Sequence, residues 1–291
     1  MTARLIINAD DFGQTRGINR AVAELHAAGA LTSATLMANG PAFDDAVAVA
    51  LAHPTLGVGC HIVLTDGLPV SDPASIPSLI EPGSKTFRTS LGAFLIAVLR
   101  GKIREDDIAR EALAQIQKLQ RAGIHVTHLD THKHTHVLAD VAQPLLAVAE
   151  RAGVRAIRNP FERSWSMNIG RSGFSRRAQV AVVARLRSRF MRLPQIQNKT
   201  VATTDGTIGI SATGRLDAAT LRSTLAALPN GLWEIVCHPG YNDSDLDAVT
   251  TRLRASRDIE RTALTEIFGS SSLHPSAPEL IHYGELESKR G

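Results

Sequence analysis

Short apolar runs alternate with helical patterns along this chain. Nearly continuous apolar runs bounded by polar residues predict buried strands, and apolar residues three or four positions apart predict helices. The predicted strands are Arg4–Ala9, Thr32–Met37, Leu56–Leu64, His125–Leu129, Val154–Ile157, Trp233–Cys237 and Leu280–His282. The predicted helices are Gly17–Ala28, Phe43–Ala52, Leu91–Leu99, Asp106–Ala122, Val141–Ala152, Ala178–Phe190, Ala218–Ala227 and Asp247–Phe268. This order predicts a parallel α/β sheet, either doubly wound or closed into a barrel.

Residues 65–90 interrupt the alternation. They are rich in Pro, Ser, Asp and Gly and predict a long loop, which in a compact domain is usually functional and often part of a substrate cleft. In the strand before it, Gly57 and Gly59 predict a close approach of backbone. No internal repeat or low-complexity linker divides the chain, so we expect residues 1–291 to form one domain.

The composition is that of an ordinary globular protein. Apolar residues make up 44% of the 291 residues and charged residues 21%, which allows a sizeable core. The longest apolar runs are well short of the about 20 residues that a membrane-spanning helix needs. The N-terminus enters a strand pattern at once, without a signal-peptide pattern. With only Cys60 and Cys237, a disulfide scaffold is excluded and a cytoplasmic location is expected.

Positive charge is concentrated in one segment. The formal net charge is +4, yet no acidic residue lies between Glu162 and Asp205, where eight arginines and Lys199 are found. The stretch Arg163–Lys199 is typical of a solvated helix face, or of a peripheral contact with an anionic membrane. No reader motif accompanies it, so nucleic-acid binding is not expected. A homodimer is compatible with the sequence, but no segment identifies an interface.

Acidic residues and histidines follow several predicted strands. In a parallel α/β architecture, functional groups collect at the carboxyl ends of the strands. The residues at these ends are Asp10, Asp11, His61, Asp130, His132, His134, His136 and His238. Taken singly, an Asp pair is compatible with a helix cap, and one histidine with a core residue. Four strands delivering such groups to one edge predict a metal or catalytic site, because burying them without such a task is costly.

Two imidazoles and one carboxylate, with room for water, suit Zn²⁺, Fe²⁺, Mn²⁺, Co²⁺ or Ni²⁺. Mg²⁺ prefers oxygen ligands, so the imidazoles count against it. A bound cation lowers the pKa of its water and polarises a carbonyl oxygen. Asp10 is the candidate base that takes the proton of this water, and His238 is the candidate acid that protonates the leaving amine. Cys60 and Cys237 directly precede two of the histidines, so on strands their thiols should point away from the site.

Four segments resemble the YdjC-like carbohydrate deacetylases, which include chitooligosaccharide deacetylases and a hopanoid-biosynthesis branch. The segments are LIINADDFG (Leu5–Gly13), GCHIVL (Gly59–Leu64), THLDTHKHTH (Thr127–His136) and VCHPGY (Val236–Tyr241). The resemblance implies a distorted, TIM-like (β/α) barrel with mostly parallel strands. It also implies one divalent metal ion, with Zn²⁺ or Mg²⁺ favoured and Mn²⁺, Co²⁺ or Ni²⁺ compatible. The implied reaction is hydrolysis of the N-acetyl group of an amino sugar.

Carried over residue by residue, the resemblance implies that Asp11, His61 and His132 are the metal ligands. It implies that Asp10 is the base and His238 the acid. Arg158, after the next strand, is expected to orient Asp10 or to bind substrate. Asp130, His134 and His136 are expected to support the ligands or to face the substrate.

Two features depart from the chitooligosaccharide enzymes. Lys133 stands where those enzymes tend to carry His, and the Arg163–Lys199 stretch has no evident role on a soluble sugar. A cationic surface beside the cleft would fit a lipid-linked amino sugar at a membrane. Two alternatives stay open, namely another metal-dependent hydrolase such as a phosphoesterase and a non-catalytic sugar-binding protein. A two-metal phosphoesterase needs further bridging carboxylates, and mere binding needs neither a base nor an acid.

Overall fold

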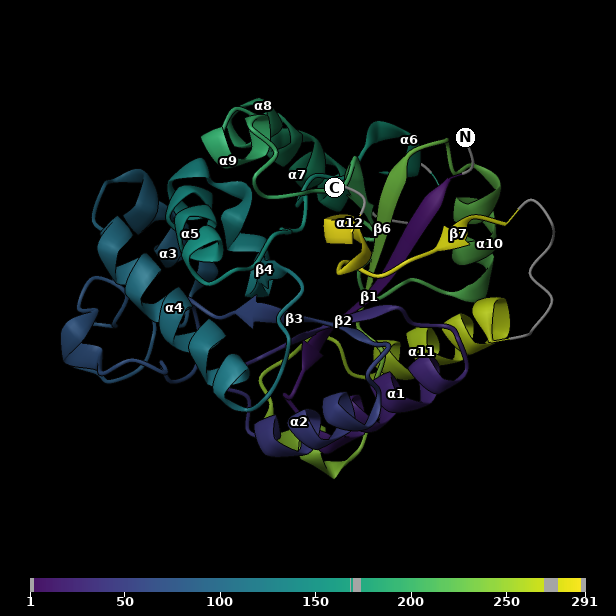
Figure 1. Cartoon of the computed structure of the whole chain (residues 1–291), viewed down its shortest axis with the longest axis horizontal. Helices are drawn as coiled ribbons and strands as arrows, with labels where there is room; N and C mark the ends of the chain where they lie inside the picture. Colours follow the sequence, from purple (N-terminus) through teal and green to yellow (C-terminus); the bar gives the residue numbers. More distant parts are fainter. Residues whose placement is uncertain (1–2, 168, 170–173, 270–276, 289–291) are drawn as a thin grey trace.

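The computed structural model describes residues 3–167, 169, 174–269 and 277–288, and within them a parallel sheet is surrounded by helices (Figure 1). The strands are β1 (Arg4–Phe12), β2 (Ser33–Leu36), β3 (Gly57–Ile62), β4 (Leu129–Thr131), β5 (Gly206–Ile208), β6 (Leu232–Cys237) and β7 (Glu279–Leu280). Six strands lie in the order β4-β3-β2-β1-β6-β5, and β7 pairs with the start of β1. Every pairing between these strands is parallel, which confirms the predicted α/β class.

The sheet is an incomplete barrel whose gap is spanned by an irregular segment. Ile157 forms a parallel bridge with Leu129 of β4, and Ala156 forms one with Ala202. Farther along, the Thr207 amide of β5 donates to the Phe161 carbonyl over 3.2 Å. The predicted strand Val154–Ile157 therefore exists only as isolated bridges. The sequence was compatible with either a doubly wound sheet or a barrel. The bridges that connect β4 to β5 through residues 156–161 and Ala202 favour the distorted barrel.

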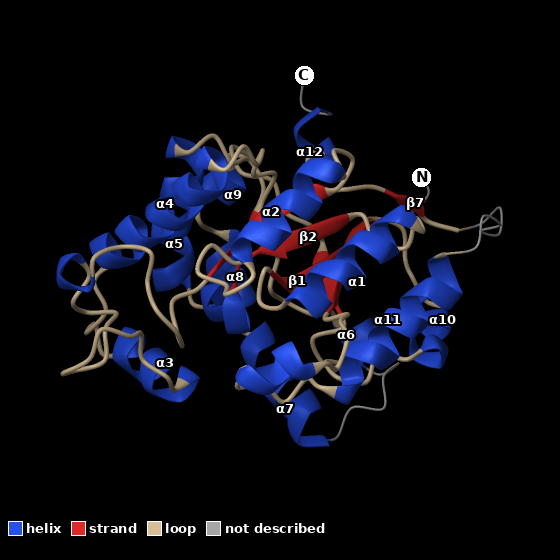
Figure 2. Cartoon of the chain, turned by 90° about the horizontal axis from the view of Figure 1, so that it is seen from below, coloured by secondary structure: helices blue, strands red, loops and turns tan. Residues whose placement is uncertain are grey.

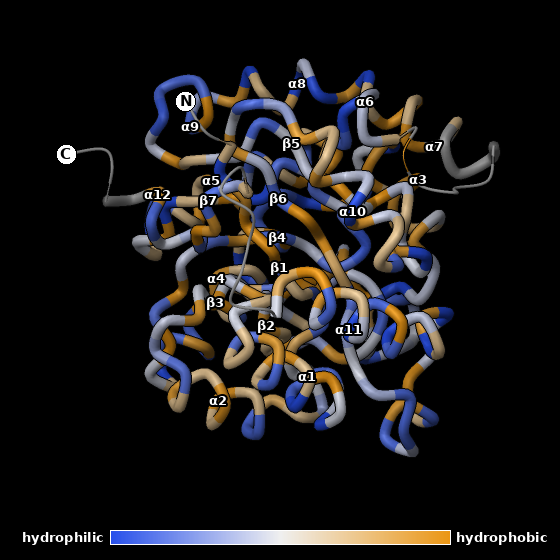
Figure 3. The backbone as a smooth tube through the Cα atoms, turned by 90° about the vertical axis from the view of Figure 1, so that its right-hand side faces the viewer, coloured by the Kyte–Doolittle hydropathy of each residue, from blue (hydrophilic) through white to orange (hydrophobic). Residues whose placement is uncertain are grey.

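Helices cover the outside of the sheet. They are α1 (Arg16–Ala27), α2 (Phe43–Ala52), α3 (Leu91–Leu99), α4 (Glu105–Arg121), α5 (Ala139–Arg151), α6 (Ser164–Met167), α7 (Phe174–Ala184), α8 (Arg187–Met191), α9 (Pro194–Gln197), α10 (Ala218–Ala226), α11 (Ala255–Phe268) and α12 (Glu285–Ser288), with 3₁₀ turns at Pro73–Ser75, His132–Val137 and Ser244–Ala248. Figure 3 shows β1 and β6 as hydrophobic runs at the centre of the molecule. None of the described helices is both long and apolar enough to cross a membrane.

The barrel has two distinct ends. In Figure 2 both termini, α12 and β7 lie toward the top, whereas α3 and α7 lie toward the bottom. Because β1 begins beside the N-terminus, its carboxyl end faces the end that carries α3 and α7. The parallel neighbours of β1 end on the same side. The strand ends that were expected to carry the chemistry therefore share one face.

Several predicted boundaries are wrong. The expected strand His125–Leu129 becomes regular only at Leu129 and continues to Thr131. The expected helix Asp247–Phe268 begins at Ala255 instead, after a 3₁₀ turn over Ser244–Ala248. Residues 249–254 separate the two, and they include Val249, Thr250 and Thr251. These β-branched residues lose side-chain freedom in a helix. The expected helix Ala178–Phe190 is divided between α7 and α8, and β5 was not expected at all.

The two glycines of β3 are required by their neighbours. A Cβ on Gly59 would lie 2.5 Å from the His128 ring, and one on Gly57 would lie 2.8 Å from the Cβ of His282. The prediction of close packing is thus confirmed. Cys60 and Cys237 are both buried, as expected for small hydrophobic side chains.

The loop 65–90 is held in place by buried polar side chains of α4. The Glu111 carboxylate accepts the amides of Val70 at 2.8 Å and Ser71 at 2.9 Å, and also the Gln115 side chain at 2.8 Å. Asp107 accepts both the amide and the hydroxyl of Ser78. A loop without regular strands or α-helices is thus fixed by side chains in place of a backbone ladder.

We expect Glu111→Ala to lower the free energy of unfolding by about 2–3 kcal/mol, because it leaves two loop amides and the Gln115 side chain without their acceptor. Urea denaturation measures this loss, and hydrogen exchange should be faster in residues 66–90 than in the wild type. Glu105→Ala is the matched control, since Glu105 is exposed on the same helix. Equal stability and equal exchange in both variants would contradict the anchoring role of Glu111.

Candidate metal centre and active site

A bulge at the end of β1 places two adjacent carboxylates in the site. Ala9 pairs with Ala34 and Phe12 with Leu36, so β1 uses one residue more than β2 between these pairs. Asp11 has a φ of 65°, in the left-handed region that Asp tolerates better than most residues. In a regular strand, neighbouring side chains point to opposite faces, and a bulge re-aims one of them. Both Asp10 and Asp11 are buried as a result.

Asp11, His61 and His132 converge from the ends of three strands. Asp11 Oδ1 lies 3.7 Å from His61 Nε2 and 3.4 Å from His132 Nδ1, and these two nitrogens are 3.3 Å apart. Ligands held about 2.1 Å from a tetrahedral ion are separated by about 3.4 Å. The three residues therefore fit one divalent ion, with two nitrogen donors and one oxygen donor.

Asp130 fixes the orientation of His61. Its Oδ1 lies 2.7 Å from His61 Nδ1, so the other ring nitrogen, Nε2, is turned toward Asp11 and His132. Thr35 Oγ1 lies 3.2 Å from the same His61 nitrogen. Burial lowers the pKa of His61, but Asp130, Asp10 and Asp11 outweigh it and raise that pKa to about 9. A carboxylate behind a histidine is the usual partner of a metal-ligating imidazole.

Asp10 is bound by a buried guanidinium. Arg158 donates from Nη1 to Asp10 Oδ2 over 2.9 Å and from Nη2 to Oδ1 over 2.6 Å. The same guanidinium contacts Asp130 at 2.5 Å and Glu234 at 2.8 Å. Burial raises the pKa of Asp10, but Arg158 and the nearby His61 and His238 lower it well below its usual value. Arg158 thus contacts both oxygens of Asp10 and favours its ionised form. Whether Arg158 orients Asp10 or binds substrate stays a prediction.

His238 lies on the open side of Asp10. It follows β6, its Nε2 is 3.9 Å from Asp10 Oδ2, and its side chain is 12% exposed. The amide of His238 donates to Glu260 Oε2 over 2.6 Å, which fixes the start of the segment after β6. Within the described part of the chain, His238 Nδ1 has no hydrogen-bond partner.

His134 and His136 do not join the ligand cluster. After β4 the chain turns into the 3₁₀ segment, in which Lys133 and His134 have φ values of 58° and 51°. His136 is buried with Nδ1 2.7 Å from the Thr131 hydroxyl, and burial together with Arg158 lowers its pKa to about 3. Burial also lowers the pKa of His134. Lys133 points outward and its Nζ lies 3.2 Å from Asp66, so it ties the loop 65–90 to this segment.

Residues missed by the sequence analysis surround the site. Arg257 of α11 donates to Asp11 Oδ2 over 2.6 Å, and Glu234 of β6 accepts from Arg158, Thr207 and Tyr283. Glu234 lies within a predicted strand, and a charged residue in a fully buried strand was a usable signal. Arg257 gave no such signal, because an arginine in a predicted helix is normally solvated.

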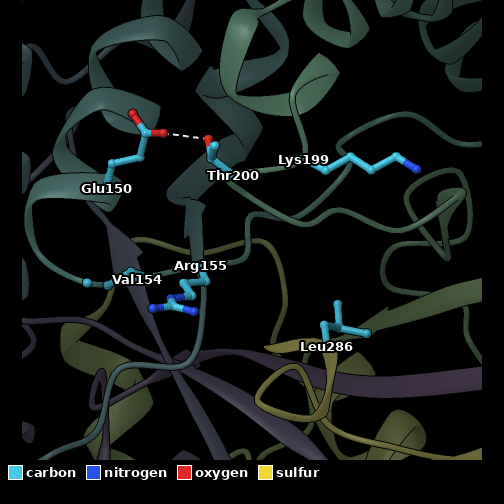
Figure 4. Close-up of a pocket in the computed structure, with 7 residues that line it drawn as sticks. Glu150, Val154, Arg155, Lys199, Thr200 and Leu286 are labelled. Carbon is cyan, nitrogen blue, oxygen red and sulfur yellow. Dashed lines mark hydrogen bonds between the residues drawn. The ribbon is translucent and has the colours of Figure 1, made fainter. Parts of the chain in front are cut away.

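A cavity of about 380 Å³ lies elsewhere, lined by Glu150, Arg155, Lys199, Thr200 and Leu286 among others. Figure 4 shows these side chains, with Thr200 donating to the Glu150 carboxylate. Glu150 belongs to the end of α5 and Leu286 to α12, so this cavity lies toward the end of the barrel opposite to the histidines. It includes none of the candidate site residues.

A solved structure shares the fold of this chain. A proposed cellobiose-phosphate cleavage protein from Enterococcus faecalis is 24% identical, and the match covers 98% of this chain and 99% of that protein with a TM-score of 0.77. At this identity the likeness supports the fold alone.

Curated relatives carry the name of one activity. A carbohydrate deacetylase of Brevibacillus brevis is 42% identical over 158 residues, which are 54% of this chain and 60% of that protein. A chitooligosaccharide deacetylase of Salmonella typhimurium is 36% identical over 52% of this chain and 57% of its own length. A carbohydrate deacetylase of Thermoanaerobacter pseudethanolicus is 28% identical over 90% of both chains. The chain thus aligns with less than two thirds of the first two relatives.

The model of the YdjC-like protein family matches residues 4–273, a span that begins with β1 and includes all the candidate site residues. The family resemblance drawn from the four sequence motifs is confirmed by this match. The chain belongs to the YdjC-like family.

Proposed function

We propose that this chain is a metal-dependent hydrolase that removes the N-acetyl group from an amino sugar, and so cleaves a linear C–N amide bond. The observation that carries the proposal is the cluster of Asp11, His61 and His132 beside an ionised Asp10 and a half-buried His238. The names of the relatives support a carbohydrate deacetylase. The donor set favours Zn²⁺, Mn²⁺, Co²⁺ or Ni²⁺ over Mg²⁺.

In this proposal, Asp11, His61 and His132 hold the ion. When bound, a divalent ion supplies a Lewis acid for the acetyl carbonyl and lowers the pKa of a water molecule. Asp10 accepts the proton of the attacking water through Oδ2, to which Arg158 Nη1 donates a hydrogen bond over 2.9 Å. His238, on the other side of Asp10 Oδ2, donates a proton to the leaving amine. Arg158 keeps Asp10 ionised and correctly turned throughout.

A two-metal phosphoesterase is the weaker alternative. The second group of potential ligands among the described residues is Asp10, His61 and Asp130. Arg158 already binds both carboxylates of that group, so its positive charge disfavours a second cation there. A sugar-binding protein without turnover would need neither the ionised Asp10 nor His238 beside it.

The substrate is proposed to be a chitooligosaccharide or a lipid-linked N-acetylglucosamine. Acetate release from both, measured with metal-stripped protein re-supplied with Zn²⁺, Mn²⁺, Co²⁺, Ni²⁺ or Mg²⁺, tests the function. Metal-dependent release from either substrate supports it and identifies the substrate branch. No release from either substrate, with metal demonstrably bound, would reject N-acetyl hydrolysis of these sugars.

The helices of the basic stretch that the structure describes are divided between the two ends of the barrel. In Figure 2, α7 lies at the end that holds the strand carboxyl ends, whereas α9 lies toward the termini. The same end carries exposed apolar side chains, namely Ile96 and Leu99 of α3 and Val182 of α7. Exposed Arg100 and Lys102 follow α3 directly. We propose that this end contacts an anionic membrane, which would bring a lipid-linked sugar to the site.

Asp10→Asn should keep the bound metal and lower kcat by about 10²–10⁴-fold, the usual contribution of a general base. Metal content of the purified protein and the rate of acetate release measure the two effects separately. A fully active Asp10→Asn variant would show that Asp10 is not the base.

His132→Ala should lose metal binding and activity together, because it removes one of the three ligands. Metal content after dialysis and the rate of acetate release are the measurements. His125→Ala is the control, since His125 is exposed and precedes the β4 segment. Retention of metal in His132→Ala at the level of the control would reject His132 as a ligand.

Leu99→Asp should reduce flotation of the protein with vesicles of anionic phospholipid at low salt, because it places a charge on the proposed contact surface. Leu51→Asp is the matched control, since Leu51 is 57% exposed at the end of α2 that leads to the start of β3. Wild-type protein that does not float, or equal flotation of both variants, would contradict the membrane contact.

A further inference from the structure

Arg257 is a buried arginine that contacts a proposed metal ligand. It lies in the first turn of α11 and is fully buried. Its Nη2 donates to Asp11 Oδ2 over 2.6 Å and to Gln14 Oε1 over 3.3 Å, and its Nε donates to the Leu253 carbonyl over 3.0 Å. The guanidinium is thus held next to Asp11 through two of its nitrogens, Nε and Nη2.

The contact divides the two oxygens of Asp11. Oδ2 is taken by Arg257, whereas Oδ1 faces His61 and His132 at 3.7 and 3.4 Å. Burial raises the pKa of Asp11, but Arg257 and then His132 lower it well below its usual value. The position of Arg257 thus turns Asp11 with a single oxygen, Oδ1, toward the histidines.

The segment after β6 packs closely against the Arg257 side chain at Gly240. A Cβ on Gly240 would lie 3.1 Å from Arg257 Cδ and 3.0 Å from Ile18 Cγ1. The amide of Gly240 also donates to the Arg257 carbonyl over 3.3 Å. The motif VCHPGY thus has a glycine at position 240 because a larger residue would contact the Arg257 side chain and Ile18.

We infer that Arg257 is a positioning residue that fixes Asp11 as a one-oxygen metal ligand before the ion arrives. The inference rests on the proposed metal centre and extends it to a residue outside the strand-end motifs. A guanidinium on Oδ2 prevents that oxygen from joining the ion as a second donor. It also holds the carboxylate against rotation about its side-chain bonds.

The test is Co²⁺ binding to Arg257→Met, a change that keeps a long side chain and removes the charge. We expect the affinity, measured by calorimetry, to fall by about 10–100-fold, as is typical when a partner of a metal ligand is removed. We also expect weaker visible absorption of bound Co²⁺, because release of Oδ2 raises the coordination number. Arg254→Met is the control, since Arg254 directly precedes the same helix and contacts Leu246 and Asp247 instead.

A folded Arg257→Met variant with wild-type affinity and an unchanged cobalt spectrum would overturn the inference while leaving the proposed metal centre intact. Wild-type protein that binds no Co²⁺ would overturn the metal centre and this inference together. If Arg257→Met does not fold, Arg257→Lys replaces it, since lysine keeps the charge but lacks the planar fork and the reach of arginine. We then expect an affinity loss of about tenfold, and an unchanged affinity and spectrum would overturn the inference.

Discussion

Two adjacent carboxylates at the end of β1 set the constraint that the rest of this site satisfies. Asp10 and Asp11 are both buried, and Asp130 and Glu234 bring two further carboxylates into the same region. Buried like charges raise one another's pKa unless cations compensate them. Arg158 compensates Asp10, Asp130 and Glu234, and Arg257 compensates Asp11. Removal of either guanidinium would leave an unpaired buried charge, which is far costlier than the loss of an exposed pair.

The irregular part of the barrel follows from the same constraint. Arg158 follows the bridge residue Ile157, and its own amide donates to the Leu129 carbonyl, so the segment passes beside β4 with its guanidinium inside the barrel. There it meets a network that includes Asn8, Thr35, Thr207, Glu234 and Tyr283. A barrel usually fills its interior with layers of branched apolar side chains. Here the half of the interior near the carboxyl ends of the strands is polar. Most of its buried polar side chains have hydrogen-bond partners, as a stable buried network requires.

The sequence predicted those site residues whose position depends on local pattern alone and not on contacts with distant residues. Parallel strands end on one face, so the convergence of Asp10, Asp11, His61, His132 and His238 was predictable from strand patterns and four motifs. The pairing of Arg257 with Asp11 joins residues 246 positions apart, and nothing in the pattern of α11 distinguishes this arginine from its solvated neighbours. Likewise, Asp130, His132, His134 and His136 alternate in sequence, but the strand ends at Thr131 and the 3₁₀ turn sends the later histidines elsewhere. Tertiary contacts overrode the local pattern there.

Hydrogen-bond capacity separates the roles of two neighbouring, chemically identical side chains. Asp10 Oδ1 accepts from Arg158, Asn8 and Thr35, which leaves it no lone pair for an ion. Among the described residues, Asp10 Oδ2 accepts from Arg158 alone and keeps a lone pair on the side of His238, where a base would need it. Asp11 accepts from Arg257 on Oδ2, so its Oδ1 is available to join His61 and His132. The number of donors that each oxygen already serves thus supports the proposed assignment of Asp11 as ligand and Asp10 as base, which the family resemblance implied.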